Sequence, residues 1–221
     1  MSDLDPPSKP AAPLSTRDRI LAEAERLFAH RGYAGTSLRQ VADAVGVTPP
    51  NLYNHFRSKR ALYEAVLDRG IAPLIEILGR SQREDWSEPA TVRMLEDIFS
   101  YLDRSPHLPR LVYFEMLTGG EVLRRIAESW IRPLLITAVA ALEEQGDDGW
   151  EVEELPLLVS AWFNLVCGHF VTSELMREAL GPDAAASDIG NQIRFFIRLW
   201  RRIAPQPRPQ GLRAVDDPTP T

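Results

Sequence analysis

The amino-acid sequence predicts an all-α protein with a small N-terminal helix-turn-helix domain and a larger C-terminal helical domain. Apolar residues recur at helical spacing through most of the chain, and no convincing alternating strand pattern accompanies them. Two short helical patterns, joined at a glycine, lie within residues 37–56. Nine of the 18 prolines fall in residues 1–14 and 204–221, so we expect both ends to be disordered tails.

The first predicted helix begins after Ser15, whose side chain can cap it, with Asp18 as its capping-box partner. His30 and Arg31 suit its C-terminal end, and Gly32 stops it. The residues that share its apolar face are Ile20, Leu21, Ala24, Leu27 and Phe28.

The second predicted helix starts with the capping-box pattern Ser37-Leu38-Arg39-Gln40 and ends at Gly46. Its apolar residues are Leu38, Val41, Ala42 and Val45. A fourth helix is expected to begin near Ser58 and to run to about residue 80, with a kink at Pro73.

Between these helices, the stretch Thr48–Phe56, TPPNLYNHF, combines two prolines with Leu52 and Phe56 at helical spacing. Proline has no N–H, but the first turn of a helix needs none. Pro49 and Pro50 can therefore open a third helix directly behind the threonine that caps it. This helix would bury Leu52 and Phe56 against the second helix, which is a helix-turn-helix pattern.

With its centre buried, the third helix turns outward a face made of Pro50 and Asn54, flanked by Asn51, Tyr53 and Arg57. Asparagine can bind an adenine edge through two hydrogen bonds, and proline can contact a thymine methyl group. Phosphate contacts can come from Ser37, Thr48, Tyr53, His55 and Lys59. A purely structural role is the alternative for Tyr53, and also for His55, which lies close to the buried side.

Residues 16–67, TRDRILAEAERLFAHRGYAGTSLRQVADAVGVTPPNLYNHFRSKRALYEAVL, resemble the DNA-binding domain of TetR-type transcriptional regulators. The resemblance rests on the A-x-x-L-F, G-Y and T-S lead-in, on the A-x-x-x-G-V turn, and on L-Y-x-H-F followed by a basic residue and Lys. It implies an all-helical homodimer that binds palindromic double-stranded DNA. It also implies a C-terminal core that binds a small-molecule effector, which weakens DNA binding.

Transferred to the matching positions, the resemblance implies DNA contacts by Ser37, Thr48, Pro49, Pro50, Asn51, Tyr53, Asn54, His55 and Lys59. Many relatives have a small or charged residue where one of the two prolines stands, so donors available elsewhere in the family are missing here, and the resemblance does not determine which bases are read. The implied domains are a helix-turn-helix domain at 15–60, with a connecting helix at 58–80, and a ligand-binding and dimerisation domain at 61–203.

The C-terminal part has helical patterns at 89–103, 106–118, 121–144, 153–180 and 186–203. Pro133 should kink the helix at 121–144, and Gly181-Pro182 should end the helix at 153–180. Residues 155–172 contain no Asp, Glu, Lys or Arg. The length of this uncharged stretch is near the lower limit for a membrane span. Pro156, Asn164 and Gly168 within that stretch favour a buried helix, so we expect no membrane span.

The helix at 153–180 carries apolar rows on two faces, with Val159, Phe163, Val166 and Phe170 in the second row. A helix of this kind is buried on both sides, and pairs of such helices from two subunits can form a four-helix bundle. The predicted dimer interface comprises Leu158, Trp162, Leu165, His169, Ile189, Ile193, Phe196 and Trp200. Alternatively, both rows serve the core of one subunit.

The predicted effector pocket combines aromatic and apolar residues with His107, Glu115 and His169 as polar anchors. Its other candidates are Phe99, Tyr101, Tyr113, Phe114, Met116, Trp130 and Phe163. Core packing is the alternative for each of them. Their composition suggests a hydrophobic or aromatic ligand. Cys167 is interpreted as a small buried apolar residue, with a redox sensor as the alternative.

Charge and motifs narrow the function. The net charge is −6, yet residues 1–70 carry 10 Lys and Arg against 8 Asp and Glu, whereas residues 71–221 carry 15 against 23. A mildly basic end on an acidic body suits a locally bound anion. One cysteine and no signal-peptide pattern indicate a cytoplasmic protein. The sequence lacks the HExxH, CxxC, GxSxG, GxGxxG and P-loop motifs. We therefore expect that the protein is not an enzyme and that it has no cofactor or metal site.

The predicted function is therefore a homodimeric repressor that binds a palindromic operator and is released by a small hydrophobic or aromatic ligand. The alternatives are a helical receptor or interaction protein controlled by a partner protein, and a transcriptional activator.

Overall fold

The computed structural model describes residues 14–81, 88–118, 120–133, 135–136, 139, 152–181 and 189–203. Within these ranges the chain forms helices and no strand, as the sequence predicted. The α-helices are α1 (Thr16–Arg31), α2 (Leu38–Val45), α3 (Pro49–His55), α4 (Lys59–Ser81), α5 (Glu88–Arg104), α6 (Leu108–Leu117), α7 (Glu121–Ile126), α9 (Leu155–Leu180) and α11 (Ile189–Ile203).

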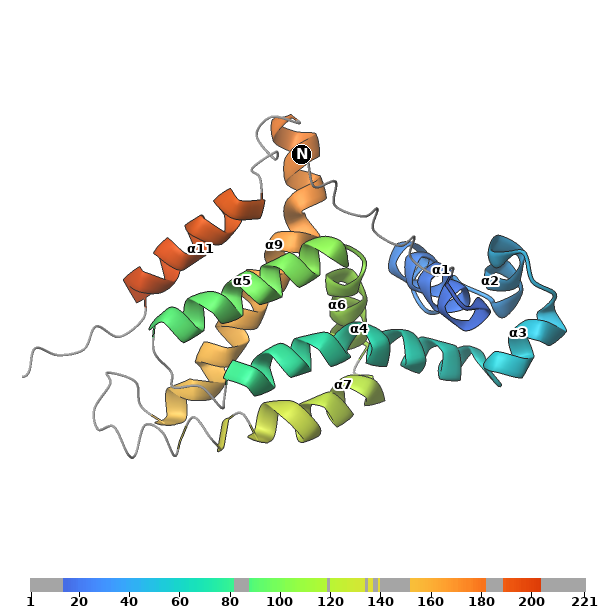
Figure 1. The fold of residues 1–221 in the computed structure, drawn as a ribbon, viewed down its shortest axis with the longest axis horizontal. Coiled ribbons are helices and arrows are strands. Elements are labelled where there is room, and N and C mark those ends of the chain that lie inside the picture. The colour runs from blue at the N-terminus through green and yellow to red at the C-terminus, as the bar shows by residue number, and fades with distance from the viewer. Residues whose placement is uncertain are drawn as a thin grey trace, which may run out of the picture.

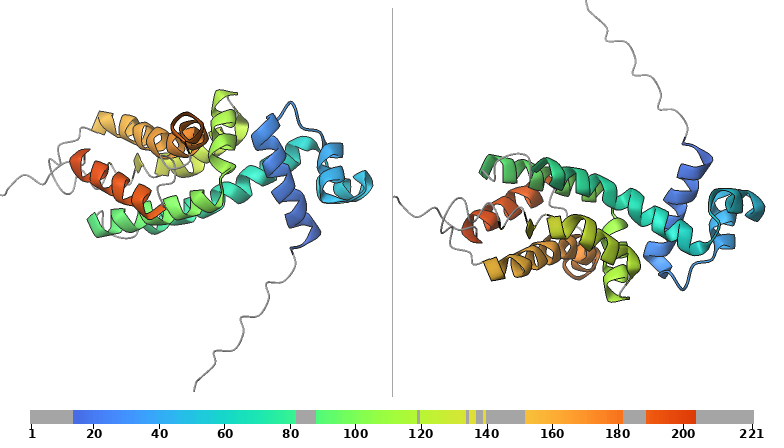
Figure 2. Two further views of the ribbon diagram at one scale, coloured as in Figure 1. Left: turned by 90° about the horizontal axis from the view of Figure 1, so that it is seen from above. Right: turned by 90° about the horizontal axis from the view of Figure 1, so that it is seen from below.

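The helices divide into two groups joined by α4. Helices α1, α2 and α3 gather at one end of the molecule, and α5, α6, α7, α9 and α11 form the body at the other end (Figure 1). Helix α4 runs from the small group into the body in each of the turned views (Figure 2), and it packs against both α1 and α5. The N-terminal group is therefore joined to the body through α4 and through the contact of α1 with α6.

Helix α1 confirms the expected cap and apolar face. The Ser15 hydroxyl accepts the Asp18 N–H at 3.1 Å, and Gly32 ends the helix with a φ of 70° that favours glycine. The five predicted apolar residues of α1 are all buried in the main hydrophobic core. Local sequence signals thus determine both ends and the buried side of this helix.

The C-terminal half departs from the sequence prediction between residues 121 and 144. Helix α7 ends at Ile126, and a π-helical turn, η1 (Ala127–Ile131), follows it directly before Pro133. Proline offers no N–H to the carbonyl four residues earlier, so the regular α-helical hydrogen-bond pattern is interrupted at this point. Residues 134, 137–138 and 140–144 of the predicted helix lie outside the described residues.

Other boundaries differ by a few residues. Predicted helices at 89–103 and 106–118 correspond to α5 and α6, and a 3-10 turn, η2 (Val152–Glu154), precedes α9. The helix predicted at 186–203 is described from Ile189 as α11. The tails expected at 1–14 and 204–221 lie outside the described residues apart from Leu14.

Helix α9 is less buried than predicted. Among its 26 residues, Leu155, Val166 and Cys167 are the ones buried within the single chain. The helix is long and apolar enough to cross a membrane by length and composition alone, which is weak evidence for a span. The residues of the predicted apolar rows from Leu158 to Phe170 are half-buried or buried, whereas Leu157, Val171, Leu175, Met176 and Leu180 of α9 are exposed.

Candidate DNA-binding site

The turn between α2 and α3 has the geometry of a helix-turn-helix. Gly46 adopts the left-handed conformation, with φ 77° and ψ 36°, and its N–H donates to the carbonyl of Ala42 at 3.0 Å. Val47 N–H donates to the same carbonyl at 3.0 Å. This tight closure of α2 lets α3 start only three residues later and pack against α2.

Side-chain caps fix the N-termini of both helices. Ser37 and Gln40 form the predicted capping box at the start of α2, with the Ser37 N–H 2.8 Å from Gln40 Oε1. At α3 the Thr48 hydroxyl accepts the Asn51 N–H at 3.4 Å, and the two prolines occupy the first two helical positions. The prolines therefore open α3, as the sequence predicted.

The orientation of α3 follows from its two buried side chains. Leu52 is 0% and Phe56 4% exposed, whereas the Tyr53 side chain is 52% exposed. The remaining predicted contacts on this helix, namely Pro49, Pro50, Asn51, Asn54 and His55, are all exposed. A continuous outer face of α3 is thus available to a partner, and Arg57 immediately after the helix is exposed as well.

Lys59, at the start of α4, is held by the loop after α1. Its ammonium nitrogen lies 4.3 Å from the centre of the Tyr33 ring and 3.4 Å from the carbonyl oxygen of Ala34. The Tyr33 ring also packs on Phe28 and Tyr63, at 6.1 and 5.0 Å between ring centres. Lys59 was among the predicted contacts and Tyr33 was not, because Tyr33 acts through a contact across 26 positions of the chain.

Two arginines outside the predicted set brace the N-terminal domain. Arg19 donates to the carbonyl of Val45 at 2.6 Å, where it satisfies the C-terminal end of α2. Arg69 of α4 bonds to Glu25 of α1 at 2.8 Å. Both contacts join segments more than 25 residues apart, and neither has a local signal in the sequence.

The predicted effector residues fall in separate places. Phe99 is buried against Phe196, with ring centres 4.5 Å apart, and next to His169, which hydrogen-bonds Gln192 at 3.0 Å. The hydroxyl of Tyr113 donates to Asn164 at 3.1 Å, and its ring lies 5.9 Å from that of Phe163. The first group joins α5, α9 and α11, and the second joins α6 and α9.

The other effector candidates lie around α6. His107 precedes α6 and faces His30 of α1, with ring centres 5.1 Å apart. Phe114 is half-buried beside Arg110, Glu115 is buried and Met116 is exposed. The side chain of Trp130 lies outside the described residues.

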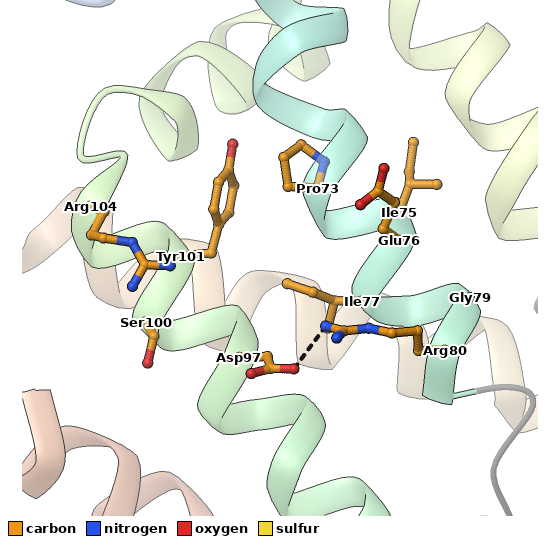
Figure 3. Close-up of a pocket in the computed structure, with 10 residues that line it drawn as sticks. All are labelled: Pro73, Ile75, Glu76, Ile77, Gly79, Arg80, Asp97, Ser100, Tyr101 and Arg104. Atoms are coloured by element: carbon orange, nitrogen blue, oxygen red, sulfur yellow. Dashed lines mark hydrogen bonds and ion pairs between the residues drawn. The ribbon is translucent and has the colours of Figure 1, made fainter. Parts of the chain in front are cut away.

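A cleft of about 830 Å³ opens between α4 and α5, at a place the sequence did not indicate (Figure 3). Of the predicted effector residues, Tyr101 lines it. The cleft also contains Pro73 of α4 and the ion pair between Arg80 and Asp97, whose N–O distance is 2.9 Å. Its charged lining differs from the apolar pocket that the sequence suggested.

The predicted dimer residues form a partly covered surface on α9 and α11. Phe196 is buried, the side chain of Trp200 lies outside the described residues, and the other six are half-buried. Other large apolar side chains of these two helices are exposed: Leu157, Val171, Leu175, Met176 and Leu180 on α9 and Phe195 on α11. We refer to these six exposed residues as the α9–α11 apolar surface.

Two observations bear on chemical reactivity. Burial raises the pKa of the Cys167 thiol to about 12, so the thiol is protonated at neutral pH and a poor nucleophile. Among the described residues, no group of three or more His, Cys, Asp or Glu side chains could hold a metal ion.

Comparison with known proteins agrees with the geometry of α1–α4. Residues 20–66 match the family model of the bacterial regulatory proteins, tetR family. The chain is 26% identical over 147 residues to the probable HTH-type transcriptional regulator YttP of Bacillus subtilis, which covers 65% of this chain and 70% of YttP. It is 37% identical over 109 residues to the HTH-type transcriptional regulator RutR of Escherichia coli, which covers 47% of this chain and 49% of RutR.

The fold is also similar to that of solved transcriptional regulators. The structure of the TetR family transcriptional regulator PfmR from Thermus thermophilus superposes with a TM-score of 0.63 at 18% identity, covering 90% of this chain and all of PfmR. Similarity thus extends through the C-terminal body in fold, and is strongest in sequence over the helix-turn-helix. Residues 20–66 thus form a domain of the tetR family of bacterial regulatory proteins, and the whole chain is similar in fold to regulators of that family.

Proposed function

We propose that this regulator is a cytoplasmic, homodimeric repressor that binds a palindromic operator and is released by a small hydrophobic or aromatic ligand. The observation that carries the proposal is the outer face of α3, which presents polar side chains to solvent while Leu52 and Phe56 anchor the helix. Such a helix fits the major groove, whose base edges are within reach of short polar side chains.

Base reading on α3 is assigned to its exposed amides. Asn51 and Asn54 can each form two hydrogen bonds with an adenine, and Pro50 can contact a thymine methyl group. Two N–H groups are missing from the first turn because of the prolines, so the backbone of α3 offers fewer donors to phosphate than usual.

Phosphate contacts are assigned to the side chains around that first turn. The oxygen of the Thr48 hydroxyl accepts from Asn51, which leaves its proton available to a phosphate. The Ser37 hydroxyl instead donates to Gln40 at 3.1 Å and must break that bond first. Tyr53 and His55 are exposed, and Lys59 has donors beyond the one directed at Ala34. We therefore rank Thr48 and Lys59 above Ser37.

A second copy of the chain is the proposed cover for the α9–α11 apolar surface. Burial of such a surface is favourable at about 25 cal/mol per Å² of apolar area. Pairing of α9 and α11 with their symmetry mates gives a four-helix bundle, and the two α3 helices can then meet successive major grooves about 34–36 Å apart.

Repression and ligand release complete the proposal. A dimer that covers a promoter represses by occupancy alone, whereas activation needs an additional surface for the transcription machinery. Release requires a ligand that binds more tightly to a conformation of the dimer in which the distance between the two α3 helices does not match the DNA. The aromatic groups around Phe99 and Phe163 suit a hydrophobic or aromatic ligand.

The test uses the purified protein and DNA selected from a random library. We expect a palindromic selected site, a two-subunit particle in analytical ultracentrifugation, and binding that weakens steeply with salt. In a purified transcription system, a promoter overlapping this site should be silenced, and an apolar compound that raises the thermal stability of the protein should restore transcription. Stimulated transcription would instead identify an activator, and DNA release only by a partner protein would favour the receptor alternative.

A further inference from the structure

Helix α4 contains a break in its hydrogen-bond ladder at Pro73. Proline has no N–H, so the carbonyl of Arg69, four residues earlier, receives no helical hydrogen bond from it. The neighbouring carbonyl, that of Gly70, accepts a hydrogen bond from the hydroxyl of Tyr101 on α5 at 2.7 Å. A side chain from the C-terminal body thus binds the backbone of α4 within one turn of its weakest point.

The two sides of this break have different principal neighbours. Before it, Arg69 bonds to Glu25 of α1, and ion pairs join α4 to α7 at Arg60–Glu121 and Asp68–Arg125. After it, Ile77 is buried and Arg80 is paired with Asp97 of α5. Bending at the break would therefore move α1–α3, together with the parts of α6 and α7 that contact α1 and the first half of α4, relative to α5.

Close packing from α6 restricts the same point. A Cβ atom on Gly70 would lie 2.6 Å from Cδ1 of Leu108, so the glycine allows α6 to approach the backbone of α4. Leu108 is buried, whereas the Tyr101 side chain is half-buried and lines the cleft between α4 and α5 (Figure 3). Leu108 and Tyr101 thus contact the backbone at Gly70 from two different helices, α6 and α5.

We infer that Tyr101 is a positioning residue for DNA recognition: its hydrogen bond to Gly70 fixes the bend of α4, and thereby the half-site spacing that the dimer accepts. This inference rests on the proposed binding of a palindromic operator by a homodimer. The segment from Lys59 to Gly70 forms a lever about 17 Å long at 1.5 Å per residue. A bend of roughly 10° would displace its end by about 3 Å, which is close to the 3.4 Å rise of one DNA base pair.

The experiment compares operators that differ only in half-site separation. The site selected by the wild-type protein is synthesised with its natural spacing and with one base pair added or removed between the half-sites. The ratio of dissociation constants for altered and natural spacing is measured for the wild type, Tyr101→Phe and Asp97→Ala. Asp97→Ala is the matched control, because it also removes one polar contact between α5 and α4, to Arg80, but on the far side of the break.

Loss of one hydrogen bond should lower the spacing ratio of Tyr101→Phe about three- to tenfold. Asp97→Ala should keep the wild-type ratio even if its melting temperature falls equally, because a purely stabilising contact would not change spacing preference. Pro73→Ala restores the missing N–H and should shift the preferred separation itself. The inference is overturned if wild type discriminates between spacings and Tyr101→Phe discriminates equally well. Wild-type protein that binds no palindrome would overturn the proposed function, and this inference with it.

Discussion

Lys59 lies with its ammonium nitrogen 4.3 Å from the centre of the Tyr33 ring, so a cation next to the recognition helix is positioned by a residue from the loop after α1. The ring restricts a long, flexible side chain before DNA arrives. This lowers the entropy lost when the ammonium group contacts a phosphate.

Substitution of Lys59 should weaken DNA binding without changing sequence preference. Lys59→Ala removes one phosphate contact, so the slope of log affinity against log salt should become shallower by about 1. Tyr33→Leu should weaken binding in the same uniform way, and Tyr33→Phe, which keeps the ring, should bind as wild type does. Affinity measured at several salt concentrations checks this, and an unchanged slope in Lys59→Ala would show that Lys59 does not contact DNA.

Substitution of Asn54 should instead change which base is preferred. Asn54→Ala loses an amide that can bind an adenine, so discrimination at one base pair of each half-site should fall by about 1–3 kcal/mol. Asn54 is exposed, so the melting temperature should not change. Binding to a panel of single-base operator variants provides the measurement. An equal loss on every variant would mean that Asn54 contacts the DNA backbone.

Two glycines should respond oppositely to a methyl group. At Gly120 an added Cβ would overlap the carboxylate of buried Glu115, so Gly120→Ala should lower the free energy of unfolding by about 1–3 kcal/mol. At Gly79, inside α4, nothing lies within 4 Å of the added atom. Gly79→Ala should therefore raise stability by about 0.5–1 kcal/mol. Denaturant unfolding of both variants decides the matter, and similar effects at the two sites would contradict the packing described for Glu115.

The contact between α1 and α6 should make stability sensitive to acid. Burial, followed by the nearby His30, lowers the pKa of His107 below its usual 6.5. The unfolded chain therefore binds a proton at this position more tightly than the folded chain does. The resulting contribution to stability is present above about pH 6.5 and is lost as pH falls through the folded pKa. His107→Asn should flatten the decline of melting temperature below about pH 6.5; an unaltered decline would assign it to other groups.

The N-terminal domain could be predicted closely because its signals are local. The caps at Ser15, Ser37 and Thr48 and the stop at Gly46 depend on residues within four positions of each other. The buried side of α3 follows from the spacing of Leu52 and Phe56 alone. These features required no knowledge of the rest of the chain.

The remainder depends on contacts between distant segments. Pairing of Arg19 with Val45 or of Tyr101 with Gly70 leaves no periodic pattern in the sequence. The α9 helix was predicted to be buried on both sides because apolar rows do not reveal whether the covering surface is in the same chain. For the same reason, effector candidates chosen by residue type were distributed over several packed regions.

Hydroxyl-radical footprinting of the protein on its selected site tests whether a dimer reads a palindromic operator through α3. We expect two protected patches related by two-fold symmetry, with half-site centres about one helical turn or a multiple of it apart. Both patches should be lost in an Asn51→Ala, Asn54→Ala double variant that keeps its wild-type melting temperature. Protection without two-fold symmetry, or protection unaffected by changes on α3, would contradict it.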